Sequence, residues 1–229
     1  MTAATEHSQN VEGAAPPSRY PRWMLIVLGV VCAAALFAAG FAVAIPSHVG
    51  RPAALPGDSS VDAGFARDML VHHQQAVVMA GTTRDRTGDA AVRLLAYDIE
   101  TQQLTETGVF KGWLDVWGLL AESDNEPMSW MAGGHMHMQS GGLMPGMATT
   151  AELTTLKSLT GRALDIMFLQ LMIRHHQGGI PMAQYAAEHA QTAYVRTAAR
   201  KMADAQSLEV VNMEKMLRDL GGSPLPPPS

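Results

Sequence analysis

The feature that most constrains the fold of this chain is an internal duplication. Residues 62–80 and 165–183 carry the same series of Asp, Phe, Met, His-His-Gln and Met in the same order. The offset between the two copies is constant at 103 residues, from 62 to 165, from 72 to 175 and from 79 to 182. A pattern repeated at one fixed offset indicates a repeated structural unit.

The duplication continues beyond the His-His stretches. Residues 90–118 align without a gap to residues 193–221, and the apolar positions there follow helical spacing. Each repeat is therefore predicted to be a helix pair, and two such amphipathic pairs bury their apolar faces against each other. This predicts an all-α, four-helix bundle over residues 58–221. The matching positions are Ala90, Val92, Arg93, Ala96, Gln103, Glu106, Leu114 and Gly118 with Ala193, Val195, Arg196, Ala199, Gln206, Glu209, Leu217 and Gly221.

Local signals place the elements. Ser59 or Ser60 caps the first helix, residues 81–83 and 86–88 bracket a break, and a second helix follows over about 89–120. Glycine and proline make residues 121–149 a loop, and the capping box of Thr149 and Glu152 begins a short helix to about 158. In the second His-His helix, Pro181 is predicted to cause a kink or an end just after His176. A last helix covers about 192–220, before a Pro-rich tail at 222–229 that is predicted to be unstructured.

The N-terminal part of the chain predicts export, either as a membrane anchor or as a signal sequence. Residues 1–21 are polar and are predicted to be disordered. Residues 22–45 form a predicted transmembrane helix with the N-terminus inside, because an uncharged apolar run follows Arg19 and Arg22. Cleavage after Ala44 as a signal sequence is the alternative, and either outcome exports the domain. Residues 46–57 are a linker, so we expect a single-pass cell-membrane protein with its C-terminal domain outside the cytoplasm, or a secreted one if cleaved.

The composition excludes several classes of partner and of metal site. The net charge is −5 and only 16% of residues are charged, so nothing indicates a nucleic-acid partner. The one cysteine, Cys32, lies in the apolar run, which excludes a disulfide framework and a thiolate zinc site. The sixteen methionines are the unusual feature.

The repeated helix presents candidate metal ligands. Helical spacing places Met69, His72 and His73 on one broad face, with Met79 two turns further on. Adjacent residues differ by 100°, so one histidine of each pair is expected to face inward and the other to lie at a seam or the surface. The set recurs as Met172, His175, His176 and Met182, and the carboxylate and amide groups expected to orient the imidazoles are Gln103, Glu106, Gln206 and Glu209. The alternative is that each inward histidine is only a hydrogen-bonded core residue.

The loop between the repeats is the strongest metal signal. It is too rich in glycine to form a helix, so its methionines have no evident packing role. Thioethers select Cu(I) and imidazole suits both copper states, which predicts copper, with Cu(I) favoured and Cu(II) open. Silver fits the same ligands. Zinc or nickel could bind at His135 and His137, but no carboxylate or thiolate partner is available there. The metal-free alternative is that the loop is a low-complexity linker. The candidate ligands in the loop are Met131, His135, Met136, His137, Met138, Met144 and Met147.

These motifs resemble those of a known family. The second His-His stretch, the Met/His-rich loop before it and the Gln-x-x-Glu after it are similar to the bacterial "domain of unknown function 305" family over about residues 58–221. The resemblance implies a ferritin-like four-helix bundle that is usually exported, with some members associated with copper binding and tolerance. The second copy carries the more typical Gly178-Gly179 where the first has Gln75-Ala76, so it is the better candidate site.

We therefore expect an exported copper-binding protein that sequesters or delivers copper, with the metal ion and the membrane as partners. A homo-oligomer or a copper-handling partner protein is left open. We expect no enzyme, because nothing resembles a nucleophile–base pair or a phosphate-binding loop. The alternatives are a metal-free, membrane-tethered interaction module and a haem-binding bundle, while a di-iron enzyme lacks its Glu-x-x-His motifs.

Overall fold

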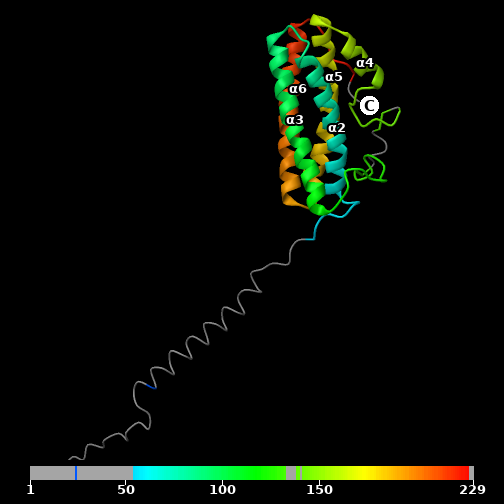
Figure 1. The fold of residues 1–229 in the computed structure, drawn as a ribbon, viewed down its shortest axis with the longest axis vertical. Helices are drawn as coiled ribbons and strands as arrows, with labels where there is room; N and C mark the ends of the chain where they lie inside the picture. Colours follow the sequence, from blue (N-terminus) through cyan, green and yellow to red (C-terminus); the bar gives the residue numbers. More distant parts are fainter. Residues whose placement is uncertain (1–23, 25–53, 133–137, 140, 227–229) are drawn as a thin grey trace, which may run out of the picture. The chain divides into compact units, whose positions relative to one another are not determined.

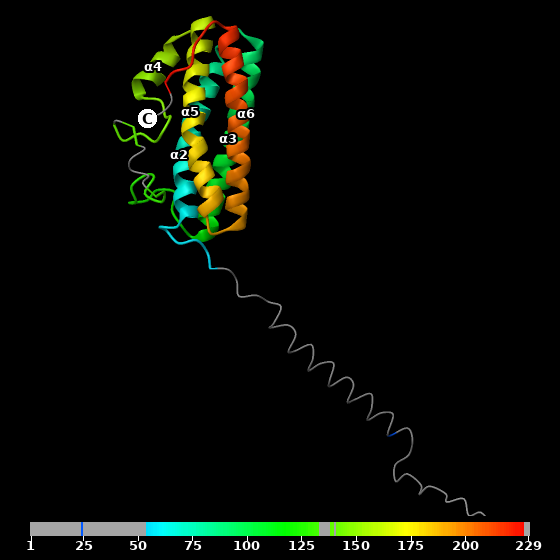
Figure 2. The same cartoon turned by 180° about the vertical axis from the view of Figure 1, so that it is seen from behind.

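The computed structural model describes residues 24, 54–132, 138–139 and 141–226. Within these ranges the chain is all-α, as predicted, and the only β pairing described is an isolated bridge between Gln139 and Leu143. Four long helices lie side by side, and a short helix and the loop lie along one side of them (Figures 1 and 2). The helices are α2 Val61–Arg84, α3 Ala90–Trp117, α4 Thr150–Ser158, α5 Gly161–His189 and α6 Ala193–Asp219.

The two repeats form two helix hairpins that pack together. Helix α2 packs along α3, α5 packs along α6, and α2 and α5 also contact each other. The C-terminal end of α3 meets the N-terminal end of α6, where Trp117 Nε1 donates a hydrogen bond to the Tyr194 hydroxyl at 2.8 Å. The inner surfaces of α2 and α5 thus face each other, and these are the helices that carry the His-His motifs.

The aspartate that opens each repeated stretch ties the two hairpins together. Asp62, at the start of α2, is fully buried and accepts hydrogen bonds from the Gln191 and Thr192 backbone N–H groups, in the turn between α5 and α6. Asp165, its counterpart 103 residues later, accepts a hydrogen bond from the Thr87 hydroxyl at 2.5 Å, in the turn between α2 and α3. Each motif therefore locks the turn of the other hairpin.

Most predicted element ends are confirmed. Ser60 caps α2, and Thr149 and Glu152 form the predicted capping box of α4. The break after α2 comes later than residues 81–83, because the Thr82 and Thr83 hydroxyls bond back to carbonyls four residues earlier and the helix continues to Arg84.

Pro181 was predicted to make α5 kink or end just after His176. The helix does not end there. Helix α5 continues through Pro181 to His189. The turns on both sides of the proline are buried, with His176 and Met182 both at 0% exposure. Tertiary packing of these turns outweighs the loss of one backbone hydrogen bond at the proline.

The C-terminal tail is partly held, which differs from the unstructured tail that was expected. Residues 222–226 form no helix, but the Ser223 carbonyl accepts a hydrogen bond from Gln170 Nε2 at 2.7 Å. Leu225 packs half-buried against the core.

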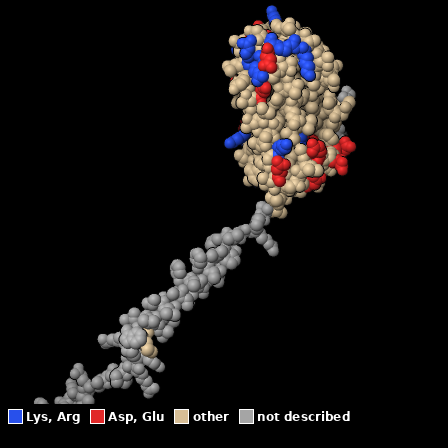
Figure 3. Space-filling view, viewed as in Figure 1, with Lys and Arg blue, Asp and Glu red and all other residues tan. Residues whose placement is uncertain are grey.

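Among the described residues, no helix combines the length and the apolar character that a membrane span requires. The predicted tail at 1–21, the predicted transmembrane segment at 22–45 apart from Met24, and residues 46–53 of the linker lie outside the described residues. On the face shown in Figure 3, charged side chains of the helical unit gather towards its two ends.

Candidate metal centre

The two repeats meet at a pair of histidines whose rings are in close, tilted contact. His72 of α2 and His175 of α5 have ring centroids 3.8 Å apart, with the rings inclined at 38°. Both side chains are buried, at 0% and 1% exposure. The duplicated motifs therefore converge on one shared centre rather than forming two separate ones.

The ring protons of this pair are directed at backbone groups. His72 Nε2 lies 3.0 Å from the Pro145 carbonyl oxygen, which can only accept, so Nε2 carries the proton and Nδ1 carries a lone pair. Burial lowers the pKa of His72 to about 3. Burial also lowers the pKa of His175 well below its usual value, against an opposing hydrogen bond to the His72 backbone. Both imidazoles are thus neutral at pH 7, the form that binds metals.

The second histidine of each pair lies at a seam between helices. His73 Nε2 contacts Glu106 Oε2 of α3 at 2.7 Å, and His176 Nε2 contacts Glu209 Oε2 of α6 at 2.7 Å. These are the glutamates that were expected to orient the rings. The second histidine of each pair was expected at a seam or at the surface; it lies at the seam, and all four histidines are buried.

The two glutamines that were expected to share this role are buried as well. Gln103 and Gln206 are buried at 2% and 3% exposure, and the Oε1 atom of each has no hydrogen-bond partner within the part of the chain described. A Cβ on Gly179 would lie 2.9 Å from Gln206 Oε1, 3.3 Å from His72 Cε1 and 3.6 Å from His72 Nδ1. The bare α-carbon of Gly179 is therefore what lets the amide and the imidazole approach each other across α5.

One end of the loop is fastened over the histidine pair. We call residues 144–148 the strap. A Cβ on Gly178 would lie 2.0 Å from the Pro145 carbonyl oxygen, so only glycine allows the strap to lie on α5 at this point. Gln75 of α2 holds the strap by two hydrogen bonds to the Ala148 backbone, at 2.9 and 2.6 Å. The strap therefore closes the centre on both inner helices.

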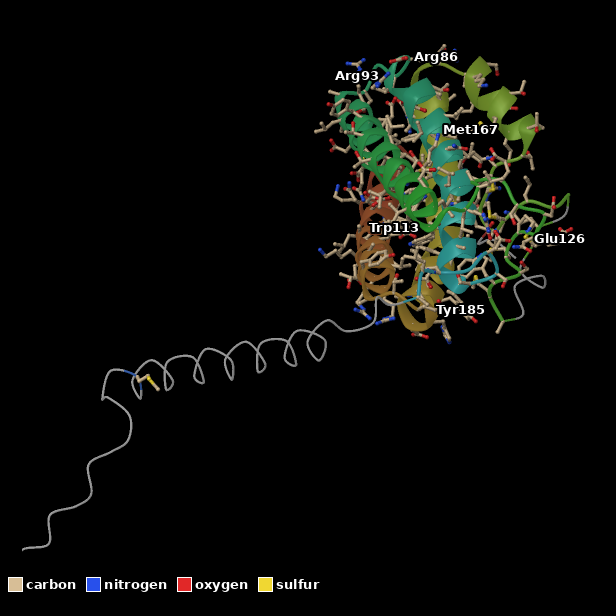
Figure 4. All side chains as sticks on the ribbon, turned by 60° about the horizontal axis from the view of Figure 1, so that its bottom comes forward. Arg86, Arg93, Trp113, Glu126, Met167 and Tyr185 are labelled. Atoms are coloured by element: carbon tan, nitrogen blue, oxygen red, sulfur yellow. The ribbon has the colours of Figure 1, made fainter. Side chains whose placement is uncertain are left out.

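The other end of the loop is anchored near the start of α2. Asp68 Oδ2 accepts hydrogen bonds from the Met128 backbone N–H at 2.7 Å and from Trp130 Nε1 at 2.6 Å. The indole lies directly on Gly64, where a Cβ would come within 2.3 Å of it. Glu126, in the same segment, lies out on the loop side of the bundle, away from Trp113 on α3 (Figure 4).

The methionines gather across the repeats rather than within them. Met69 of α2 and Met182 of α5 belong to one buried cluster, to which the loop contributes Met128, Met144 and Met147, with Met131 and Met138 half-buried against it. Met79 and Met172 belong to a second cluster. His135, Met136 and His137 lie outside the described residues.

The residues present fit a soft metal ion. Within the described ranges, no group of three or more His, Cys, Asp and Glu side chains is arranged to hold a metal. The soft donors available are buried thioethers and the imidazoles of the paired histidines, and His72 Nδ1, His73 Nδ1, His175 Nε2 and His176 Nδ1 have no hydrogen-bond partner among the residues described. Rings whose other nitrogen is fixed by a carboxylate or carbonyl are typical of metal-bound histidine.

Sequence reasoning missed the residues that position this centre. Pro145 and Asp68 were not singled out, and Gly178-Gly179 was noted only as typical of the family, although Pro-Gly in the loop and Gly-Gly within a helix were both visible. A glycine pair inside a helix indicates the close approach of another backbone, and that signal pointed to the strap.

Solved structures of other proteins share this fold. The crystal structure of a DUF305 protein from Streptomyces coelicolor, described as presumptively secreted, is 43% identical with a TM-score of 0.69, and the match covers 74% of this chain and 99% of that one. A DUF305 fragment from Deinococcus radiodurans is 30% identical with a TM-score of 0.59, covering 73% and 99%.

CopM matches in two copper-bound forms. Its Cu(I)-bound form is 22% identical with a TM-score of 0.52, covering 70% of this chain and 98% of CopM. Its Cu(II)-bound form is 24% identical with a TM-score of 0.53, covering 70% and 97%. At this identity the likeness shows a shared fold.

A search of curated proteins gave no significant match. The model of one family, "Domain of unknown function (DUF305)", matches residues 62–217. The match spans most of the chain and includes both His-His stretches and the whole loop. The chain therefore belongs to the DUF305 family.

Proposed function

We propose that this chain is an extracytoplasmic, membrane-anchored protein that binds copper through methionine and histidine ligands, for sequestration, tolerance or delivery. Its scaffold is a ferritin-like four-helix bundle, and its role is binding rather than catalysis. CopM, a structural neighbour, is described in Cu(I)-bound and Cu(II)-bound forms, and the Streptomyces coelicolor neighbour is described as presumptively secreted. These descriptions support copper as the ion and export as the destination.

The observation that carries the proposal is that loop and helix methionines share one buried cluster, and that the loop segment between two of them is bonded to His72. Met144 and Met147 flank Pro145-Gly146, the Pro145 carbonyl accepts a hydrogen bond from His72, and both methionines are buried in the cluster of Met69 and Met182. Thioether sulfur is a soft donor that selects Cu(I), and neutral imidazole adds a donor that serves either oxidation state. Outside the cytoplasm such a set remains competent where thiols would oxidise.

His72 and His175 do not form the two axial ligands of one haem. Two such histidines would lie on opposite faces of the porphyrin, whereas these ring centroids lie 3.8 Å apart. A haem with one histidine and one methionine ligand would leave most of the loop methionines without a metal to bind. In a metal-free interaction module, Met128, Met144 and Met147 would serve only as packing in the apolar cluster that buries them, and the titration below distinguishes this role from metal binding.

The test is an anaerobic Cu(I) titration of the full chain against a competing chelator. The variant replaces Met131, Met138, Met144 and Met147 by leucine, a change that keeps the packed volume. We expect binding tighter than micromolar in the parent chain and a loss of on the order of 100-fold in the variant, about 2.7 kcal/mol. Replacing Met167 of α5 by leucine is the matched control, because Met167 is not a candidate ligand and packs half-buried against the other apolar cluster. Cu(I) binding that is micromolar or weaker, and equal in the parent chain and the loop variant, would contradict the proposal.

A further inference from the structure

Three aromatic side chains lie in contact at the end of the bundle where α3 meets α6. Trp113 and Trp117, one helical turn apart on α3, have ring centroids 6.2 Å apart and planes inclined at only 23°. The ring of Tyr194, at the start of α6, lies 5.7 Å from Trp113 and 6.5 Å from Trp117. Trp117 Nε1 also donates a hydrogen bond to the Tyr194 hydroxyl at 2.8 Å. We call these three residues the aromatic triad, and Figure 4 shows Trp113 beside α6.

The aromatic triad joins the methionine cluster to solvent. Trp117, at 6% exposure, belongs to the same buried cluster as the loop and helix methionines, and Trp113 packs half-buried against that cluster. Phe110, also in the cluster, contacts Trp113 with ring centroids 5.8 Å apart. Tyr194 is 47% exposed. One end of the triad therefore lies among thioethers, and the other end lies in water.

The second repeat shows that other side chains can fill these positions. At the offset of 103 residues the counterparts are aliphatic or methionine: Met213 for Phe110, Met216 for Trp113, Leu220 for Trp117 and Ala91 for Tyr194. Met213 is fully buried, and Met216 and Leu220 pack half-buried against the second cluster. Indole and phenol rings thus occur only in the half of the bundle whose cluster holds the loop methionines, although the duplicated fold packs without them.

Thioethers that hold copper are exposed to oxidation. Cu(I) reduces hydrogen peroxide by one electron, which gives Cu(II), hydroxide and a hydroxyl radical. Such an oxidant converts methionine towards the sulfoxide, a polar group that disrupts a packed methionine cluster. Indole and phenol lose one electron far more readily than the ring of phenylalanine does. The triad therefore offers an alternative source of the electron within the cluster itself.

From this arrangement we infer that Trp113, Trp117 and Tyr194 form a one-electron relay that carries oxidising equivalents from the methionine cluster to the surface. The source of the oxidant, Cu(I) with hydrogen peroxide, rests on the proposed function. The hydroxyl radical takes an electron from an indole, and the indole radical cation then takes an electron from Tyr194.

The proton leaves at the exposed end of the relay. The Tyr194 oxygen accepts the indole N–H of Trp117, so its own hydrogen is directed elsewhere and passes to water. Tyr194 becomes a neutral phenoxyl radical, and the hydroxyl radical becomes water with the electron and one proton. The indoles and the thioethers end unchanged. A small-molecule thiol in solution restores the phenol by giving up a hydrogen atom.

The experiment adds hydrogen peroxide to the Cu(I)-loaded full chain, freezes samples for electron paramagnetic resonance and maps methionine sulfoxide by peptide mass spectrometry. In the parent we expect a tyrosyl radical. In Tyr194→Phe this signal should be lost, and sulfoxide should form about threefold faster or more at the clustered methionines. The double variant Trp113→Phe and Trp117→Phe, which keeps a ring at each position, should behave like Tyr194→Phe. Tyr97→Phe, at an exposed position of α3, is the matched control and should behave like the parent.

A copper-free measurement separates this inference from the proposed function. Azide radicals made by pulse radiolysis take one electron from tryptophan in the metal-free chain, and transient absorption follows its transfer to tyrosine. In Tyr194→Phe the yield of tyrosyl radical should fall by about half or more. An unchanged yield, or sulfoxide formation at equal rates in the parent and Tyr194→Phe, overturns the inference. Transfer through Tyr194 in a chain that does not bind Cu(I) supports the relay and contradicts the proposed function. Tight Cu(I) binding without this transfer has the opposite meaning.

Discussion

His72 and Pro145 are 73 residues apart in the chain, and the imidazole Nε2 of the first donates a hydrogen bond to the carbonyl of the second at 3.0 Å. This one contact holds the proton of the buried histidine on Nε2, and it also fastens the methionine-bearing loop to the bundle. The loop and the His-His helices are therefore one structural unit, and a change at either end of the contact is expected to be felt by the other.

Gly178→Ala tests the fastening of the strap. Its Cβ would lie 2.0 Å from the Pro145 carbonyl oxygen, so the strap must lift or α5 must shift. We expect a loss of about 1–3 kcal/mol in the free energy of unfolding, measured with denaturant. Gly112→Ala in α3 is the matched control, because no described atom lies within 4 Å of its Cβ, and it should gain about 0.5–1 kcal/mol. Equal effects of the two substitutions would contradict the close approach.

Glu106 and Glu209 provide a test of the duplication. Their contacts with His73 and His176 are both 2.7 Å, and their side chains are exposed to 24% and 23%. Replacing either by alanine leaves a buried ring nitrogen without its partner, at a cost of about 1–3 kcal/mol. Glutamine keeps an acceptor oxygen and should cost less. The two alanine variants should agree within about 0.5 kcal/mol, and the double variant should be close to additive. A loss confined to one repeat would show that the pairs are not equivalent.

The buried imidazoles predict how stability depends on pH. The pKa of His72 is about 3 in the fold and near 6.5 when unfolded, so between these values the unfolded chain binds more protons. The free energy of unfolding of the metal-free protein should therefore fall as pH decreases below 6.5, by up to about 1.4 kcal/mol per pH unit from His72. The lowered pKa of His175 acts in the same direction.

His72→Gln isolates this effect in denaturant unfolding between pH 5 and 7.5. The slope should be smaller by up to about 1.4 kcal/mol per pH unit in the variant. Comparing the two proteins removes the contribution of Asp68, whose pKa is raised by burial and which acts in the opposite direction. An unchanged slope would mean that His72 titrates normally in the folded state.

Much of the fold followed from the repeat itself. The 103-residue offset predicted the hairpins, and helical spacing placed each glutamate near its histidine on the neighbouring helix. Caps such as Ser60 and the Thr149–Glu152 box are local, so a short stretch of sequence is sufficient to predict them.

What the sequence could not predict depends on contacts between distant segments. The passage of α5 through Pro181 requires burial on both sides, and the burial of all four histidines requires the loop to cover α2 and α5. The two motifs were treated as two candidate sites, of which the second was the better. In the structure α2 and α5 face each other, so that Met69 shares a cluster with Met182 and the His72 ring lies against that of His175.

The most direct test of the central claim is X-ray absorption at the copper edge of the full chain loaded with one Cu(I). Thioether ligation by the loop and helix methionines predicts copper–sulfur scattering near 2.3 Å, together with a contribution from imidazole. In the Met131, Met138, Met144 and Met147 to leucine variant the sulfur contribution should fall sharply. A spectrum with nitrogen and oxygen neighbours alone, the same in parent and variant, would contradict the claim that methionine and histidine hold copper in this protein.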